Sequence, residues 1–141
     1  EVSKHLENRS KYARCAAVEA TVHVFEKGDV RAVDAVSKRC EDQDNAVRKV
    51  AAETLVFVSE TGDARAIEAL TKRFQDSDKD VRRVAVESMA QVCERGDERG
   101  ITPVNKRLED LDENVRHAAK EAMKRLCVEG DERLEAMNKR W

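Results

Sequence analysis

The chain has 141 residues, enough for one domain, and 40% of them are hydrophobic while only 4% are aromatic, so we expect a core of small aliphatic side chains. Charged residues make up another 40%, but 27 Lys and Arg nearly balance 29 Asp and Glu, for a net charge of −2. This balance argues against a protein that attracts nucleic acid or a membrane through a global field. No stretch approaches the roughly 18 consecutive apolar residues of a membrane-spanning helix.

A Gly-Asp pair recurs every 34 residues, at 28–29, 62–63, 96–97 and 130–131. The segments that begin at the Asp of the first three pairs read DVRAVDAVSKRCEDQD, DARAIEALTKRFQDSD and DERGITPVNKRLEDLD. Self-similarity at such a period is typical of repeat proteins. We therefore expect a single domain over 1–141 that begins and ends inside a repeat and belongs to a longer array. Its expected units are a partial repeat 1–27, repeats 28–61, 62–95 and 96–129, and a partial repeat 130–141.

Each repeat is predicted to hold two helices, A and B. In the first complete repeat the apolar residues at 33, 36 and 40 form the stripe of helix A, and those between 47 and 58 form the stripe of helix B. Asp residues at 29, 63 and 97 stand where an N-cap would start helix A, and those at 44, 78 and 112 stand where one would start helix B. The glycine of each Gly-Asp pair is expected to end the preceding helix B. Pro103, with Gly100, is expected to kink the third helix A.

Two sets of basic residues recur with the repeat. Arginines at 14, 48, 82 and 116 open each helix B, placed to pair bidentately with the aspartates of adjacent inter-helix turns; an arginine row that reads an acidic partner is the alternative. Lys-Arg pairs at 38–39, 72–73, 106–107 and 139–140 lie near the end of each helix A, where cations suit the helix dipole. The alternative is that these pairs form a basic row that binds a phosphate backbone. The aspartates a few residues later would neutralise the charge of such a row.

Side chains capable of catalysis or metal binding are few and scattered. The only histidines are His5, His23 and His117, and the cysteines at 15, 40, 93 and 127 form no CxxC pair. No spacing resembles a metal site, a phosphate-binding loop or a nucleophile–base set. We therefore expect no enzyme, no metal, no cofactor and no disulfide. Free thiols favour a reducing intracellular compartment.

The order Gly-Asp-x-Arg-Ala-Ile, then Asp-x-Asp, then Val-Arg-x-x-Ala resembles the HEAT-like repeat first named from phycobilisome bilin lyases. The likeness covers essentially the whole chain. It implies an all-α, right-handed α-solenoid of stacked antiparallel helix pairs, with helices B along the concave side. It also implies uses as diverse as lyase subunits, assembly factors and scaffolds.

The expected binding surface is the row of helix B that points away from the apolar stripe. It comprises Glu19, His23, Lys49, Glu53, Phe57, Arg83, Glu87, Gln91, His117, Glu121 and Arg125. The leading hypothesis is a scaffold within a larger complex that binds a protein partner here, with Phe57 as the anchor. The alternatives are an assembly factor or lyase-like subunit for a pigment protein, which rests on the resemblance alone, and a nucleic-acid backbone binder. A solvated face of i,i+4 ion pairs would explain the row without any partner.

Overall fold

The computed structural model describes residue 6 and residues 8–140. Within them every regular element is a helix, which confirms the predicted all-α class. In chain order these are α2 (Lys11–Val24), α3 (Val30–Arg39), α4 (Asn45–Val58), α5 (Ala64–Arg73), α6 (Lys79–Val92), α7 (Glu98–Lys106), the 3-10 helix η1 (Arg107–Glu109), α8 (Glu113–Leu126) and α9 (Glu132–Arg140). No helix among these residues is long and apolar enough to cross a membrane.

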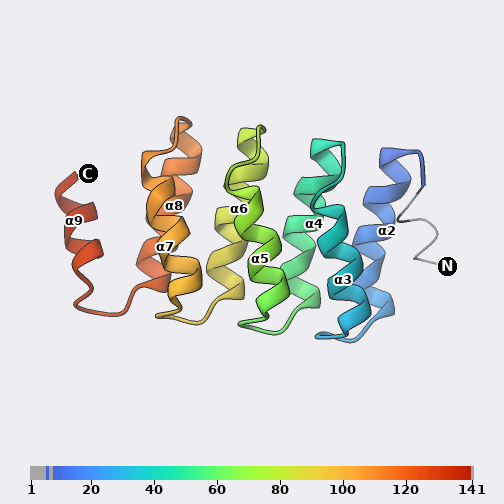
Figure 1. Ribbon diagram of the computed structural model, residues 1–141, viewed down its shortest axis with the longest axis horizontal. Coiled ribbons are helices and arrows are strands. Elements are labelled where there is room, and N and C mark those ends of the chain that lie inside the picture. Colours follow the sequence, from blue (N-terminus) through green and yellow to red (C-terminus); the bar gives the residue numbers. More distant parts are fainter. Residues whose placement is uncertain (1–5, 7, 141) are drawn as a thin grey trace.

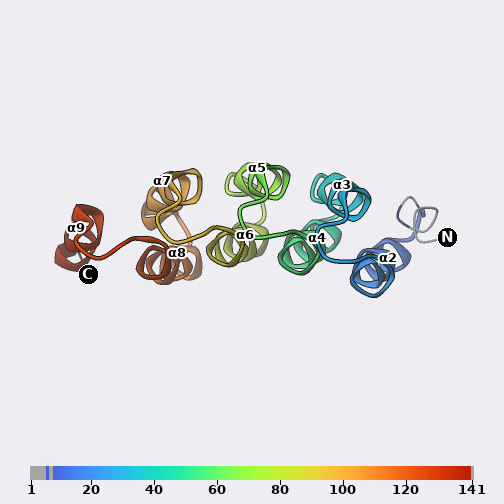
Figure 2. The same ribbon diagram turned by 90° about the horizontal axis from the view of Figure 1, so that it is seen from below.

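The helices stand side by side in two layers (Figures 1 and 2). Helices α3, α5, α7 and α9 are the predicted helices A, and α2, α4, α6 and α8 are helices B. Each B helix packs most extensively against the B helices before and after it, whereas neighbouring A helices touch less. Seen down the helix axes, the array bends gently with the B layer on its inner side (Figure 2). This is the α-solenoid that the repeat period predicts.

The predicted N-caps are confirmed. Asp29, Asp63 and Asp97 accept hydrogen bonds from backbone N–H groups in the first turn of α3, α5 and α7. The side chains of Asp44, Asp78 and Asp112 do the same for α4, α6 and α8. Each of these bonds satisfies an N–H that the helix itself leaves without a partner.

The glycines occupy a different place from the one expected. Gly28 has a φ of +89°, as a left-handed residue should, but α2 has already ended at Val24 with Phe25 as its C-cap. Gly28 is instead the third residue of a tight turn closed by the Asp29 N–H to Glu26 carbonyl bond of 3.0 Å. Its own N–H donates to the carbonyl of Val58, at 2.7 Å, at the end of the next B helix. The glycine therefore links two repeats.

The core lies between the two layers. Leu55, Met89 and Met123, at one repeating position of helices B, are each 0% exposed. Val36, Leu70 and Val104 of helices A are equally buried against them. The apolar stripes predicted for both helices are thus confirmed, and one core runs along the array.

Helix α7 differs from the other A helices. It continues past Pro103 but ends at Lys106, and a short 3-10 segment takes the place of its last turn. Gly100 serves packing, because a Cβ built on it would lie 2.7 Å from Cys93 Sγ. The glycine lets α7 approach the end of α6 closely.

Candidate protein-binding face

The eleven residues of the predicted row lie on the side of the B layer that faces away from helices A. They come from α2 (Glu19, His23), α4 (Lys49, Glu53, Phe57), α6 (Arg83, Glu87, Gln91) and α8 (His117, Glu121, Arg125). All are exposed except Lys49 and Arg83, which are half-buried. Each B helix buries its other sides against helices A and neighbouring B helices, so this side is what remains. We call these eleven residues the B face.

The glutamates of the B face fall into two kinds. Glu87 accepts a hydrogen bond from Arg83 at 3.0 Å, and Glu121 accepts one from Lys124 at 3.3 Å. Glu19 and Glu53 form no ion pair with any described residue. The free carboxylates are therefore on α2 and α4, whereas those of α6 and α8 are compensated locally. Of the two i,i+4 ion pairs that the sequence suggests on this face, Arg83 with Glu87 forms, whereas Lys49 forms none with Glu53 among the described residues. The pair of Glu121 with Lys124, three residues later on α8, was not expected.

Phe57 is the apolar exception on this face. Its side chain is 61% exposed, so it does not fold back into the core. The residues at the same repeat position are His23, Gln91 and Arg125, and all of them are exposed. Val22, which precedes His23 on α2, is also exposed, at 37%. An aromatic ring held in water at a position that is otherwise polar is a candidate contact point.

The arginines that open helices B are not part of this face. Arg14 donates to Asp42 from Nε at 2.8 Å and from Nη2 at 3.0 Å, and this bidentate pair has buried side chains on both partners. Arg48 with Asp76 and Arg82 with Asp110 repeat the arrangement. The prediction that these arginines join successive repeats is confirmed for three of the four. For Arg116 the described bonds go to the carbonyls of Asp110 and Leu111.

The same aspartates also hold the arginines of the first three Lys-Arg pairs. Arg39, Arg73 and Arg107 donate to Asp42, Asp76 and Asp110 respectively, at 3.0 to 3.3 Å. Burial alone would raise the pKa of these carboxyl groups, but the hydrogen bonds from the arginines and from a backbone N–H, together with the arginine charges, outweigh it and lower the pKa below its usual value. Because these three arginines are engaged internally and Lys72 pairs with Glu41 at 3.7 Å, little of the alternative basic row along a phosphate backbone remains available.

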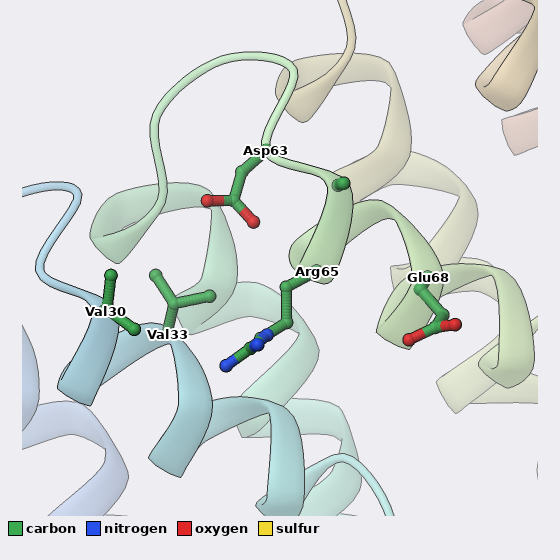
Figure 3. Close-up of a pocket in the computed structure, with 6 residues that line it drawn as sticks. Val30, Val33, Asp63, Arg65 and Glu68 are labelled. Carbon is green, nitrogen blue, oxygen red and sulfur yellow. The ribbon is translucent and has the colours of Figure 1, made fainter.

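A groove opens on the opposite side, between α3 and α5 (Figure 3). It has a volume of about 480 Å³ and is lined by Val30, Val33, Asp63, Ala64, Arg65 and Glu68. Arg65 extends toward α3 and forms an ion pair with Asp34 there. The lining mixes both charges and brings together no nucleophile and base. In the described part of the chain, no three His, Cys, Asp or Glu side chains cluster to hold a metal.

The stacked pairs, shared core and repeating arginine–aspartate clamps define an α-solenoid repeat protein. A family profile described as HEAT repeats matches residues 1–90. The chain belongs to the HEAT-repeat family.

Two solved structures resemble it, at sequence identities that show the fold alone. One is the crystal structure of an engineered protein, with a TM-score of 0.64 and 20% identity over 98% of this chain and 66% of that one. The other is a designed armadillo repeat protein in complex with the peptide (KR)4, with a TM-score of 0.68 and 19% identity over 98% of this chain and 68% of that one. This chain thus spans about two thirds of either structure. No curated protein matches the sequence.

Proposed function

We propose that this chain is a protein-interaction scaffold that binds a cationic segment of a partner along the B face, without catalysis of its own. The observation that carries the proposal is the exposed Phe57 one turn after the uncompensated Glu53 on α4, with the uncompensated Glu19 at the equivalent position of α2. An exposed aromatic ring gains stability by meeting a second surface. The free carboxylates set the sign of the charge that this surface should bear.

The fold relative supports the choice of partner chemistry. The designed armadillo protein of similar fold was solved with (KR)4, a peptide that carries a positive charge on every residue. That solenoid therefore receives a basic peptide. On the present chain, the B face is the inner surface of the bend (Figure 2) and offers glutamates in the same register of four repeats.

The test uses (KR)4 as the probe and an alternating Asp-Glu peptide of equal length as its acidic counterpart. We expect (KR)4 to bind and the acidic peptide not to, with NMR shift changes confined to exposed residues of α2, α4, α6 and α8. Replacing Glu53 and Glu87 together by Lys should weaken (KR)4 binding at least tenfold and slow its association. Added salt should weaken binding as well, since the contacts are exposed charges.

The matched control places two lysines on the other side of the array. Glu41 and Glu68 are exposed on the A layer, so the variant Glu41→Lys with Glu68→Lys changes the net charge equally. If this control weakens the binding of (KR)4 as much as the B-face variant does, the attraction depends on net charge alone and the assignment of the B face is wrong.

Phe57→Ala separates an anchor from a core residue. We expect it to weaken binding severalfold while leaving the melting temperature nearly unchanged, because most of its side chain is already in water. A variant that loses stability but keeps its affinity would contradict the anchor role.

A further inference from the structure

The chain contains its own example of a guanidinium group held by a phenyl ring and a carboxylate. Arg31 places its guanidinium 5.2 Å from the centre of the Phe25 ring. The same group donates to both carboxylate oxygens of Asp29, from Nη2 at 2.8 Å and from Nε at 3.2 Å. The arrangement forms at the surface, where the Arg31 side chain is mostly exposed. Ring and carboxylate are four residues apart.

Glu53 and Phe57 provide the same two groups on the B face, and also lie four residues apart. On an α-helix this spacing places the two side chains one above the other on one face. Both are exposed. Within the described residues, Glu53 has no ion pair and no cation stands over the Phe57 ring, although Lys49 lies one turn before Glu53. The pair thus offers the same two chemical groups without an arginine, although Phe25 and Asp29 lie across the turn between α2 and α3, whereas Glu53 and Phe57 lie one turn apart within α4.

We infer that Glu53 and Phe57 together bind an arginine side chain of the partner, an inference that rests on the function proposed above. A planar guanidinium stacks on an aromatic face and offers a fork of donors to a carboxylate at the same time. A lysine ammonium is a compact and more strongly hydrated charge, and it pairs with the carboxylate without stacking in this way. The site therefore selects arginine over lysine at this position of a basic segment.

The structure also predicts where this selectivity is absent. At the equivalent positions of α6, Glu87 is already paired with Arg83, and Gln91 stands in place of the ring. On α8, Glu121 is paired with Lys124 and Arg125 stands in place of the ring. On α2, Glu19 is free as well, but the imidazole of His23 stands in place of the phenyl ring. Among the described B helices, only α4 combines a free carboxylate with a phenyl ring at these two positions.

The probes are the amidated peptide Gly-Arg-Gly-Arg-Gly-Arg-Gly and its lysine counterpart, compared by NMR titration of the same protein. We expect the arginine peptide to bind about two to five times more tightly, the ratio that corresponds to an exposed cation–π contact. Phe57→Leu keeps an apolar side chain but removes the ring, and should bring the ratio close to one. Glu53→Gln should weaken binding of the arginine peptide more than the matched change Glu87→Gln does.

The outcomes separate this inference from the proposed function. Equal affinity for the two peptides, a preference that survives Phe57→Leu, or equal effects of Glu53→Gln and Glu87→Gln would each overturn the arginine site. If both peptides still bind in those cases and the double lysine variant of the B face weakens them, the scaffold proposal stands without it. If neither peptide binds the wild-type protein, both proposals fail.

Discussion

Arg48 of α4 donates two hydrogen bonds to the carboxylate of Asp76 one repeat later, from Nε at 2.9 Å and from Nη2 at 3.0 Å. The third nitrogen, Nη1, donates to the carbonyls of Asp42 and Gln43 in its own repeat. The Asp76 carboxylate also accepts from Arg73 and from the backbone N–H of Asp78. One buried carboxylate therefore fixes the end of one helix A, the start of the following helix B and the preceding repeat.

Asp76→Asn should be strongly destabilising. The side chain is 2% exposed, and the change leaves Arg48 and Arg73 without their counter-charge. Removing one member of a buried pair costs about 3 kcal/mol or more, which denaturant melts would measure. The exposed change Glu68→Gln is the control and should cost less than about 0.5 kcal/mol. A loss below about 1 kcal/mol for Asp76→Asn would mean that the clamp contributes little.

Stability should fall in acid because of the same aspartates. Asp42, Asp76 and Asp110 have pKa values lowered in the fold, since arginine hydrogen bonds outweigh the effect of burial. Their contribution is fully present above the unfolded pKa of about 3.9 and is lost as the pH falls through the lower folded pKa. In urea melts recorded from pH 7 to pH 3, the urea concentration at the midpoint should drop once the pH falls below about 4. The urea midpoint of Asp76→Asn should drop less over the same range. A wild-type midpoint that does not change in acid would contradict the role given to these aspartates.

The repeating core position of helix B should tolerate truncation poorly. Leu55 and Met89 are both 0% exposed, so Leu55→Ala and Met89→Ala each remove buried methylene groups and leave a cavity. We expect each to cost about 2 to 5 kcal/mol in denaturant melts. Losses under about 0.5 kcal/mol for both would be incompatible with the helix register described above.

Gly100 and Cys93 should behave as a coupled pair. Gly100→Ala gains about 0.5 to 1 kcal/mol from helix propensity, but its Cβ would lie 2.7 Å from Cys93 Sγ, so we expect a net loss of about 1 kcal/mol. One repeat earlier the same positions hold Ser59 and Ala66, both buried. Cys93→Ser combined with Gly100→Ala recreates that pair and should recover most of the loss. A double-mutant cycle with no coupling would contradict the contact.

The thiols should be slow to react in the folded protein. Burial raises the pKa of Cys40 to about 12 and that of Cys93 to about 11, so little thiolate is present at pH 8. A thiol reagent should modify the half-buried Cys15 first. After unfolding without reductant, four thiols per chain should titrate. Fast modification of Cys40 in the native protein would show that its helix end opens.

The repeat was readable from the sequence because its determinants are local. The 34-residue recurrence of Gly-Asp, the aspartate N-caps and the apolar spacing of the two helices each act within a few residues of the chain. Spacing also placed Arg48 near the aspartates of an adjacent turn, since a stacked array brings equivalent positions together. The outward row followed from helix geometry alone.

Tertiary structure decided what depends on contacts between repeats. The Gly28 N–H donates across to Val58, so the glycine lies in the inter-repeat turn and not at the helix end, a choice that local propensity does not reveal. The structure also decided which pairs form within a helix: Arg83 pairs with Glu87 and Lys124 with Glu121, while Glu53, four residues after Lys49, remains free one turn before Phe57. Identical glutamates in equivalent positions thus differ in charge compensation, because rotamers and neighbouring side chains vary from repeat to repeat although the backbone register does not.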